Sequence, residues 1–133
     1  MRYLIDTNIC IYLMNQRPIH VIRKFRECSP GTIVVSSITV SELQYGVAKS
    51  THQKKNQLRL DEFLMPLAII DYDEAAARIY GKVRAELERE GRLIGPLDML
   101  IAAHALEKHL TLVTNNEEEF NRVKNLNVEN WSH

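Results

Sequence analysis

The chain has 133 residues, of which 45% are hydrophobic and 26% charged, and its 17 basic side chains are balanced by 17 acidic ones. A chain of this length and composition can bury a core without disulfides or structural zinc, which excludes an intrinsically disordered protein. Its longest apolar runs fall far short of the roughly 20 residues needed to cross a bilayer, and its first residues lack a secretion-signal pattern, so we expect one cytoplasmic domain, residues 1–133, and no membrane partner.

Short apolar runs that stop at polar residues predict buried β-strands. The predicted strands are residues 2–5, 33–35, 67–70 and 111–114, with residues 128–131 as a candidate edge strand. Between them, apolar residues recur at helical spacing in five segments: 21–28, 40–47, 60–64, 76–87 and 97–105. Short buried strands that alternate with amphipathic helices predict an α/β fold with a mainly parallel sheet covered on both faces.

The two cysteines, Cys10 and Cys28, lie in apolar patterns and lack a C-x-x-C spacing. We interpret them as reduced packing residues, which agrees with a cytoplasmic protein.

Three acidic residues follow predicted strands or open a predicted helix, where open α/β sheets place their sites. Asp6 ends the first strand, Glu42 follows the second after a few residues, and Asp98 comes just after Gly95 and Pro96. Each also has a purely structural interpretation. Asp6 is a possible helix N-cap, Glu42 completes a T-x-x-E capping box with Thr39, and Asp98 suits a first helical turn.

Capping does not predict convergence, whereas the fold places all three carboxylates at one edge of the sheet. Carboxylates brought together repel one another unless a cation neutralises them. A set of oxygen ligands favours Mg²⁺, or alternatively Mn²⁺, over zinc. Such an ion activates water and stabilises the leaving oxygen of a phosphodiester, so the residues predict metal-assisted phosphodiester hydrolysis.

Other candidates have simpler explanations. Asp71 and Asp73 are typical of a helix start, the five histidines show no metal-ligand spacing, and no nucleotide-binding loop occurs. Core packing is the expected role of Tyr12, Tyr45 and Tyr80, with stacking on RNA bases as the alternative.

Two basic clusters are solvated helix faces by default. They become contacts to a phosphate backbone if the fold brings either one beside the acidic site. The first is Arg17, Arg23, Lys24 and Arg26, and the second is Lys49, His52, Lys54, Lys55 and Arg59.

Four segments together resemble the PIN-domain ribonucleases, and more closely the VapC-type toxins of bacterial toxin–antitoxin pairs. These segments are YLIDTNICIYL, VVSSITVSELQYGV, GRLIGPLDMLIAAHAL and LTLVTNNEEEFNRVKNLNVENW. The resemblance implies a three-layer α/β/α sandwich, divalent-metal endoribonuclease activity, inhibition by a cognate antitoxin, a homodimer and a toxin–antitoxin hetero-oligomer. It is similar in particular to toxins that cut initiator tRNA in the anticodon loop.

The resemblance also implies roles for individual residues. It makes Thr7 a residue that orients the site, and it places the fourth acid of many PIN domains near Asn116, where this chain has an amide. An amide adds no charge, so the number of metal ions stays open. For residues 117–119 we prefer a solvated helix start, with partial substitution for the missing acid as the alternative. The metal ligands and catalytic residues that it implies are Asp6, Glu42 and Asp98.

Two alternatives stay open at this point. A catalytically silent, PIN-like protein-binding module would account for Asn116 and for the neutral overall charge. A phosphoryl-receiver domain has the right size but lacks the expected acidic pair at its first strand. If an antitoxin binds, we expect an amphipathic segment in a groove near the first helix and the helices after Ile38, with a cationic side chain reaching the carboxylates.

Overall fold

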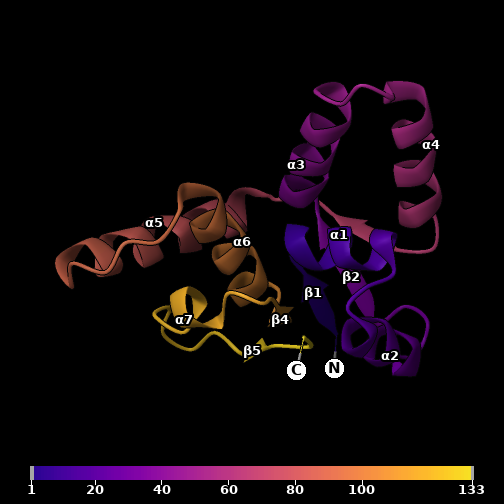
Figure 1. The fold of residues 1–133 in the computed structure, drawn as a ribbon. Helices are drawn as coiled ribbons and strands as arrows, with labels where there is room; N and C mark the ends of the chain where they lie inside the picture. Colours follow the sequence, from indigo (N-terminus) through magenta and orange to yellow (C-terminus); the bar gives the residue numbers. More distant parts are fainter. Residues whose placement is uncertain (1, 133) are drawn as a thin grey trace.

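The computed structural model describes residues 2–132, which form one five-stranded sheet with seven helices (Figure 1). The strands are β1 (Tyr3–Ile5), β2 (Ile33–Ser36), β3 (Ala68–Ile70), β4 (Thr111–Val113) and β5 (Val128–Glu129). Their order across the sheet is β3-β2-β1-β4-β5, and every neighbouring pair is parallel. Each predicted strand is confirmed, with bounds that differ by two residues at most, and so is the parallel sheet.

The helices alternate with the strands as expected. They are α1 (Thr7–Asn15), α2 (Ile19–Glu27), α3 (Ser37–Ala48), α4 (Gln53–Leu64), α5 (Glu74–Arg89), α6 (Pro96–Glu107) and the single turn α7 (Glu117–Phe120). Helix α6 does not have the one-sided apolar face that was predicted for residues 97–105. Leu97 is 46% exposed, and a nearly continuous run from Met99 to Ala105 is buried instead. None of the helices within residues 2–132 has the length and apolar character needed to span a membrane.

Alternate residues of the central strands point into two separate cores, one on each face of the sheet. Leu4, Val34 and Leu112 pack with residues of α5, α6 and α7. Ile5, Val35 and Val113 pack with residues of α1, α2, α3 and α4. Burial on both faces explains why these strands are apolar throughout, and it confirms the three-layer α/β/α arrangement. Cys10 is buried, Cys28 is half-buried, and neither forms a disulfide.

The helices extend from the sheet in two directions. Figure 1 shows α3 and α4 rising together as a hairpin, while α5 and α6 lie side by side and extend away from it. The carboxyl ends of β1 and β4, the start of α1, and parts of α3 and α6 meet where the two groups of helices diverge. The predicted acidic residues lie in this region.

Candidate functional site

Asp6 lies where β1 ends and α1 begins. Its Oδ1 accepts a hydrogen bond from the backbone N–H of Ile9 at 3.0 Å, and the Thr114 side chain also hydrogen-bonds to the carboxylate. The residue is 8% exposed, and this burial raises the pKa of Asp6, while the two hydrogen bonds oppose the rise. The capping interpretation is therefore correct. It does not exclude a functional role, because the cap uses one carboxylate oxygen.

Glu42 lies half-buried in α3, and its Oε1 accepts a hydrogen bond from the Thr7 hydroxyl at 2.9 Å. The capping-box interpretation of Glu42 is wrong, because α3 begins before Thr39. Ser36 is the actual N-cap and accepts a hydrogen bond from the Ile38 N–H at 3.1 Å. Thr39 is buried inside the helix, so Glu42 is free to contact Thr7 at the start of α1.

Asp98 occupies the first turn of α6, as predicted from Pro96. Burial raises the pKa of Asp98 to about 6, and the negative charges of Glu119, Asp6 and Glu42 raise it further, as does a hydrogen bond with Glu119. Two carboxyl groups can share a hydrogen bond only when one of them holds a proton. Three carboxylates from other elements therefore act on Asp98.

Glu119 is a site residue that the sequence suggested only as the less favoured alternative, within residues 117–119. The backbone N–H of Asn116 donates to the Thr114 hydroxyl oxygen at 3.0 Å, and its side-chain Nδ2 donates to Glu119 Oε2 at 2.6 Å. The interpretation of residues 117–119 as a solvated helix start is thus wrong for Glu119, which is half-buried beside Asp98. The available signal was its spacing of three residues from Asn116, which places both side chains on one face of a helical turn.

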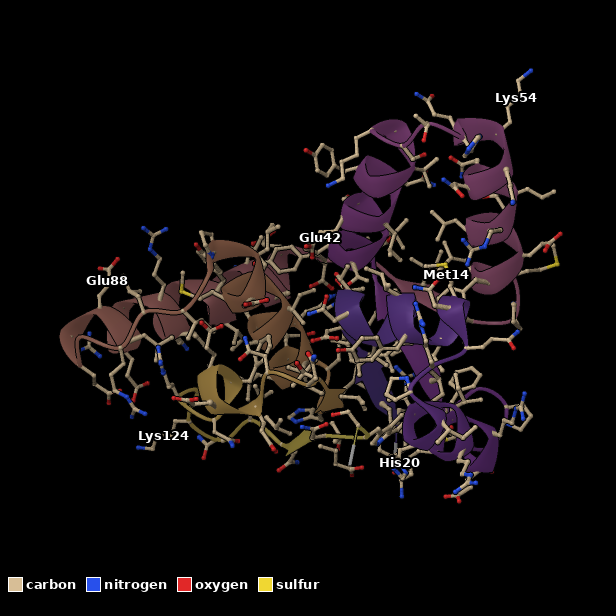
Figure 2. All side chains as sticks on the ribbon, in the orientation of Figure 1. Met14, His20, Glu42, Lys54, Glu88 and Lys124 are labelled. Carbon is tan, nitrogen blue, oxygen red and sulfur yellow. The ribbon has the colours of Figure 1, made fainter. Side chains whose placement is uncertain are left out.

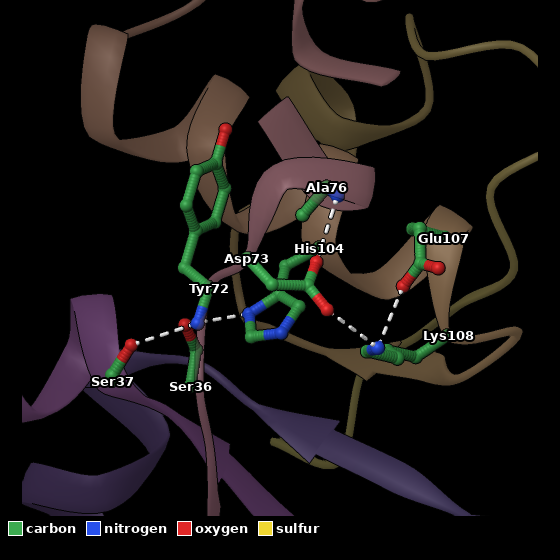
Figure 3. Close-up of polar contacts among 8 residues, drawn as sticks. All are labelled: Ser36, Ser37, Tyr72, Asp73, Ala76, His104, Glu107 and Lys108. Atoms are coloured by element: carbon green, nitrogen blue, oxygen red, sulfur yellow. Dashed lines mark hydrogen bonds and ion pairs between the residues drawn. The ribbon is translucent and has the colours of Figure 1, made fainter. Parts of the chain in front are cut away.

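A buried network connects the two helices that carry Glu42 and Asp98. His104 of α6 is fully buried, and its Nδ1 lies 2.9 Å from the hydroxyl oxygen of Ser36, the cap of α3 (Figure 3). Its ring packs edge-on against Tyr72, whose backbone N–H donates to Ser37 at 3.0 Å. Burial lowers the pKa of His104, so the neutral ring is favoured. The network holds α6 against the start of α3, and it sets the relative positions of the two carboxylates.

The donor chemistry of the site fits a hydrated hard cation. None of the ion pairs found within residues 2–132 involves Asp6, Glu42, Asp98 or Glu119. In the same part of the chain, no group of three or more His, Cys, Asp or Glu side chains is placed to hold a metal ion on its own. Mg²⁺ commonly keeps several waters and uses only one or two protein carboxylates, so an open set of oxygen ligands suits it. A tetrahedral zinc site would need nitrogen or sulfur ligands at this position.

A groove of about 230 Å³ begins at the site and lies between α1, α3 and α4. Thr7 and Glu42 form its polar end, and Arg59 lines it while bonding to the carbonyl oxygen of Met14 at 3.2 Å. Figure 2 shows Glu42 at the inner end of α3 and Met14 on α1 facing α4. Most of the remaining lining is apolar: Ile11, Met14, Leu43, Val47 and Leu60.

The three tyrosines have different environments. Tyr80 is half-buried against the core, and Tyr12 is half-buried with its hydroxyl accepting a hydrogen bond from Asn115 at 2.6 Å. Tyr45 is 66% exposed, so the core-packing prediction is wrong for this residue. Its outward direction follows from the position of α3, whose opposite face contributes Leu43 to the core.

Comparison with known proteins agrees with the fold. The PIN domain family matches residues 3–126. The chain is 47% identical to "Ribonuclease VapC2" of Rickettsia felis, over 98% of both chains, and 42% identical to "tRNA(fMet)-specific endonuclease VapC" of Shigella flexneri, over 99% of both. Among solved structures, that of VapBC2 from Rickettsia felis bound to a promoter DNA fragment superposes with a TM-score of 0.92 at 46% identity, covering 98% of this chain and 99% of that one. DNA-bound VapBC from Salmonella typhimurium gives the same TM-score at 38% identity, with 98% of both chains covered. With its parallel sheet, its acidic site and these relatives together, the chain belongs to the PIN-domain family.

Proposed function

We propose that the protein is a divalent-metal-dependent endoribonuclease and the toxin of a toxin–antitoxin pair. The observation that carries the proposal is the convergence of Asp6, Glu42 and Asp98 at one edge of the sheet, where none of them joins an ion pair found within residues 2–132. The names of the relatives, ribonucleases and VapC endonucleases, support the same activity.

In this proposal Asp6, Glu42 and Asp98 hold Mg²⁺ or Mn²⁺, which supplies an activated water and stabilises the leaving oxygen of the phosphodiester. Thr7 holds Glu42 in place through its hydroxyl, since the two side chains are 2.9 Å apart. Asn116 has a similar supporting role, because its side chain orients Glu119 toward Asp98.

The proposed substrate is the anticodon loop of initiator tRNA. The Shigella flexneri relative is named for this tRNA and matches almost the whole chain. A single-stranded loop also suits an open site, because its unstacked bases can turn toward the protein. Such a substrate places the enzyme in the cytoplasm.

The proposed inhibitor is an antitoxin segment that occupies the groove between α1, α3 and α4. The related structures are titled as VapBC complexes, and the groove combines an apolar lining with an acidic end at Glu42. An amphipathic segment with one Arg or Lys would match both properties and block the carboxylates. Homodimers that join into hetero-oligomers with the antitoxin complete this assembly.

The groove can be tested at Gly46, which lines it. A Cβ at this position meets nothing within 4 Å, so the first carbon of the Gly46→Leu side chain has room and the rest of it adds bulk to the groove. We expect at least a tenfold loss of antitoxin affinity, measured by calorimetry, with the melting temperature retained. Full antitoxin affinity would place the inhibitor on another surface.

The activity is tested with antitoxin-free protein on purified tRNA, with Mg²⁺, Mn²⁺ or EDTA. Asp6→Ala and Asp98→Asn should each lower cleavage at least a hundredfold. Asp71→Asn is the matched control, since Asp71 also follows a strand but is exposed. Cleavage that survives EDTA or both substitutions would refute the mechanism. Sequencing the ends of RNAs cleaved in cells after brief expression tests the substrate.

The silent binding module is less favoured than the sequence suggested. It rested on the amide at Asn116, but Glu119 supplies a carboxylate beside that amide. A wild-type protein that neither binds Mg²⁺ or Mn²⁺ nor cleaves RNA would restore this alternative.

A further inference from the structure

A stripe of three side chains extends along α3 from the acidic site. Glu42, Tyr45 and Lys49 are spaced by three and four residues, so they lie on one face of the helix. With a rise of about 1.5 Å per residue, Tyr45 lies about 4–5 Å and Lys49 about 10 Å further along the helix axis than Glu42.

The outer part of this stripe is an exposed aromatic ring paired with a cation. Tyr45 is 66% exposed, and the Nζ of Lys49 lies 5.0 Å from the centre of its ring. A cation at this distance is attracted by the ring face and holds the side chain in one orientation. The core does not account for such a large exposed aromatic side chain.

The charge of the surrounding segment is strongly one-sided. Residues 43–60 contain four of the 17 Lys and Arg side chains and no Asp or Glu, so the rest of the chain has 13 basic and 17 acidic side chains. None of the ion pairs within residues 2–132 involves Lys49, Lys54 or Lys55. Figure 2 shows Lys54 at the outer end of the α3–α4 hairpin and Glu42 on α3, closer to the sheet.

The basic cluster on α2 is not one-sided in charge. Arg23 and Lys24 of α2 line a hollow together with Glu27 and Glu129, so their positive charge is offset by two carboxylates. Residues 43–60 of the α3–α4 hairpin are therefore the cationic stretch next to the proposed catalytic site, and the acidic Asp61 and Glu62 follow it at the end of α4.

We propose that Tyr45 stacks on an unpaired RNA base next to the cleaved bond, while Lys49 binds an adjoining phosphate. This inference rests on the proposed ribonuclease function and identifies the surface that holds its substrate. Single-stranded nucleic acid is the occupant that matches an aromatic platform within a positive surface, because bases stack on the ring and phosphates pair with the cations.

The test measures binding of a short single-stranded RNA oligonucleotide in EDTA, where metal-dependent cleavage is absent. Tyr45→Ala should weaken binding about tenfold, as expected for the loss of one stacked base. Lys49→Gln should reduce the slope of log affinity against log salt by about 0.7, the value for one phosphate contact on a single strand. Tyr45→Trp should bind like the wild type and show fluorescence quenching when RNA is added.

Two exposed positions away from the stripe provide controls. Met65 is 80% exposed at the end of α4, and Lys82 is exposed on α5, so Met65→Ala and Lys82→Gln remove an apolar and a cationic side chain elsewhere. Both should keep wild-type RNA affinity. Trp131 is only 3% exposed and present in every variant, so its signal serves as the fluorescence baseline.

The outcomes separate this inference from the function on which it rests. If the wild type cleaves RNA but Tyr45→Ala binds and cleaves equally well, the stacking platform is refuted and the ribonuclease stands. If Tyr45→Ala changes only the oligomeric state or antitoxin affinity, the surface is a protein interface and the inference is also overturned. If the wild type never cleaves RNA but Tyr45→Trp is quenched by it, the proposed function fails and the binding surface stands.

Discussion

Replacing Asp98 by Asn should make the metal-free protein more stable while it removes a proposed metal ligand. Burial raises the pKa of Asp98, the charges of Glu119, Asp6 and Glu42 raise it further, and none of the ion pairs within residues 2–132 joins Asp98 to a Lys or Arg. The amide keeps the size of the side chain and removes the charge. The gain in stability measures what burial of the Asp98 charge and repulsion by its neighbours together cost the folded chain.

The size of the effect follows from the pKa of Asp98, which changes from 3.8 to about 6 on folding. Two pKa units correspond to about 3 kcal/mol for a fully buried group. Since Asp98 is only half-buried, solvent screening reduces the expected gain to about 1–2 kcal/mol.

The direction of the Asp98 pKa shift determines the pH range in which its carboxylate costs stability. The folded pKa of Asp98 lies above the unfolded value, so its carboxylate costs stability once it ionises. The free energy of unfolding of the wild type should therefore fall as the pH rises from about 4 to about 6, and the cost should be fully present above that. The Asn variant lacks this component, so its advantage should appear at pH 7.5 and vanish near pH 4.

Urea denaturation in EDTA at the two pH values measures the difference, with Asp71→Asn as the control for an exposed carboxylate. Added Mg²⁺ should then stabilise the wild type, because a ligand that binds only the folded state stabilises it. The difference in the free energy of unfolding between the Asn variant and the wild type should therefore become smaller. The reasoning would be refuted if the Asn variant were less stable than the wild type at pH 7.5, or if its stability advantage were the same at both pH values.

Three further changes test the surroundings of the site. Thr114→Val removes the hydroxyl that bonds to Asp6, and it should cost about 1–2 kcal/mol in urea denaturation and lower cleavage; unchanged values in both assays would contradict the contact. Gly95→Ala places a Cβ 3.3 Å from Asp98 Oδ2, so cleavage should fall about tenfold with near-normal stability, and wild-type activity would show that the carboxylate adjusts. Since the folded pKa of His104 lies below its unfolded value of 6.5, the stability that this residue contributes should be lost as the pH falls below about 6.5. His104→Gln should lack that loss between pH 7.5 and 5.5, and an identical pH dependence in both proteins would exclude His104 as its source.

Local patterns in the sequence determined most of the architecture. Short apolar runs formed the strands, and helical spacing located α2 to α6, because these periodicities follow from backbone geometry alone. The positions of Asp6 and Asp98 were also readable, since a carboxylate directly after a strand caps the next helix and a carboxylate two residues after Pro96 lies in a first helical turn. Resemblance to a family then assigned these residues a role that periodicity could not supply.

Contacts between distant segments determined the rest. Ser36 ends β2 and caps α3, and His104 of α6 contacts its hydroxyl. Because the helix begins at this earlier residue, Thr39 and Glu42 do not form the predicted capping box. Glu119 joined the site only when α7 folded against α6, and the exposure of Tyr45 depended on which face of α3 the core had occupied. Local spacing determines which side chains share a face of one element, whereas packing between elements determines which faces contact one another. The site depends on the second, because its residues come from the start of α1 and from α3, α6 and α7.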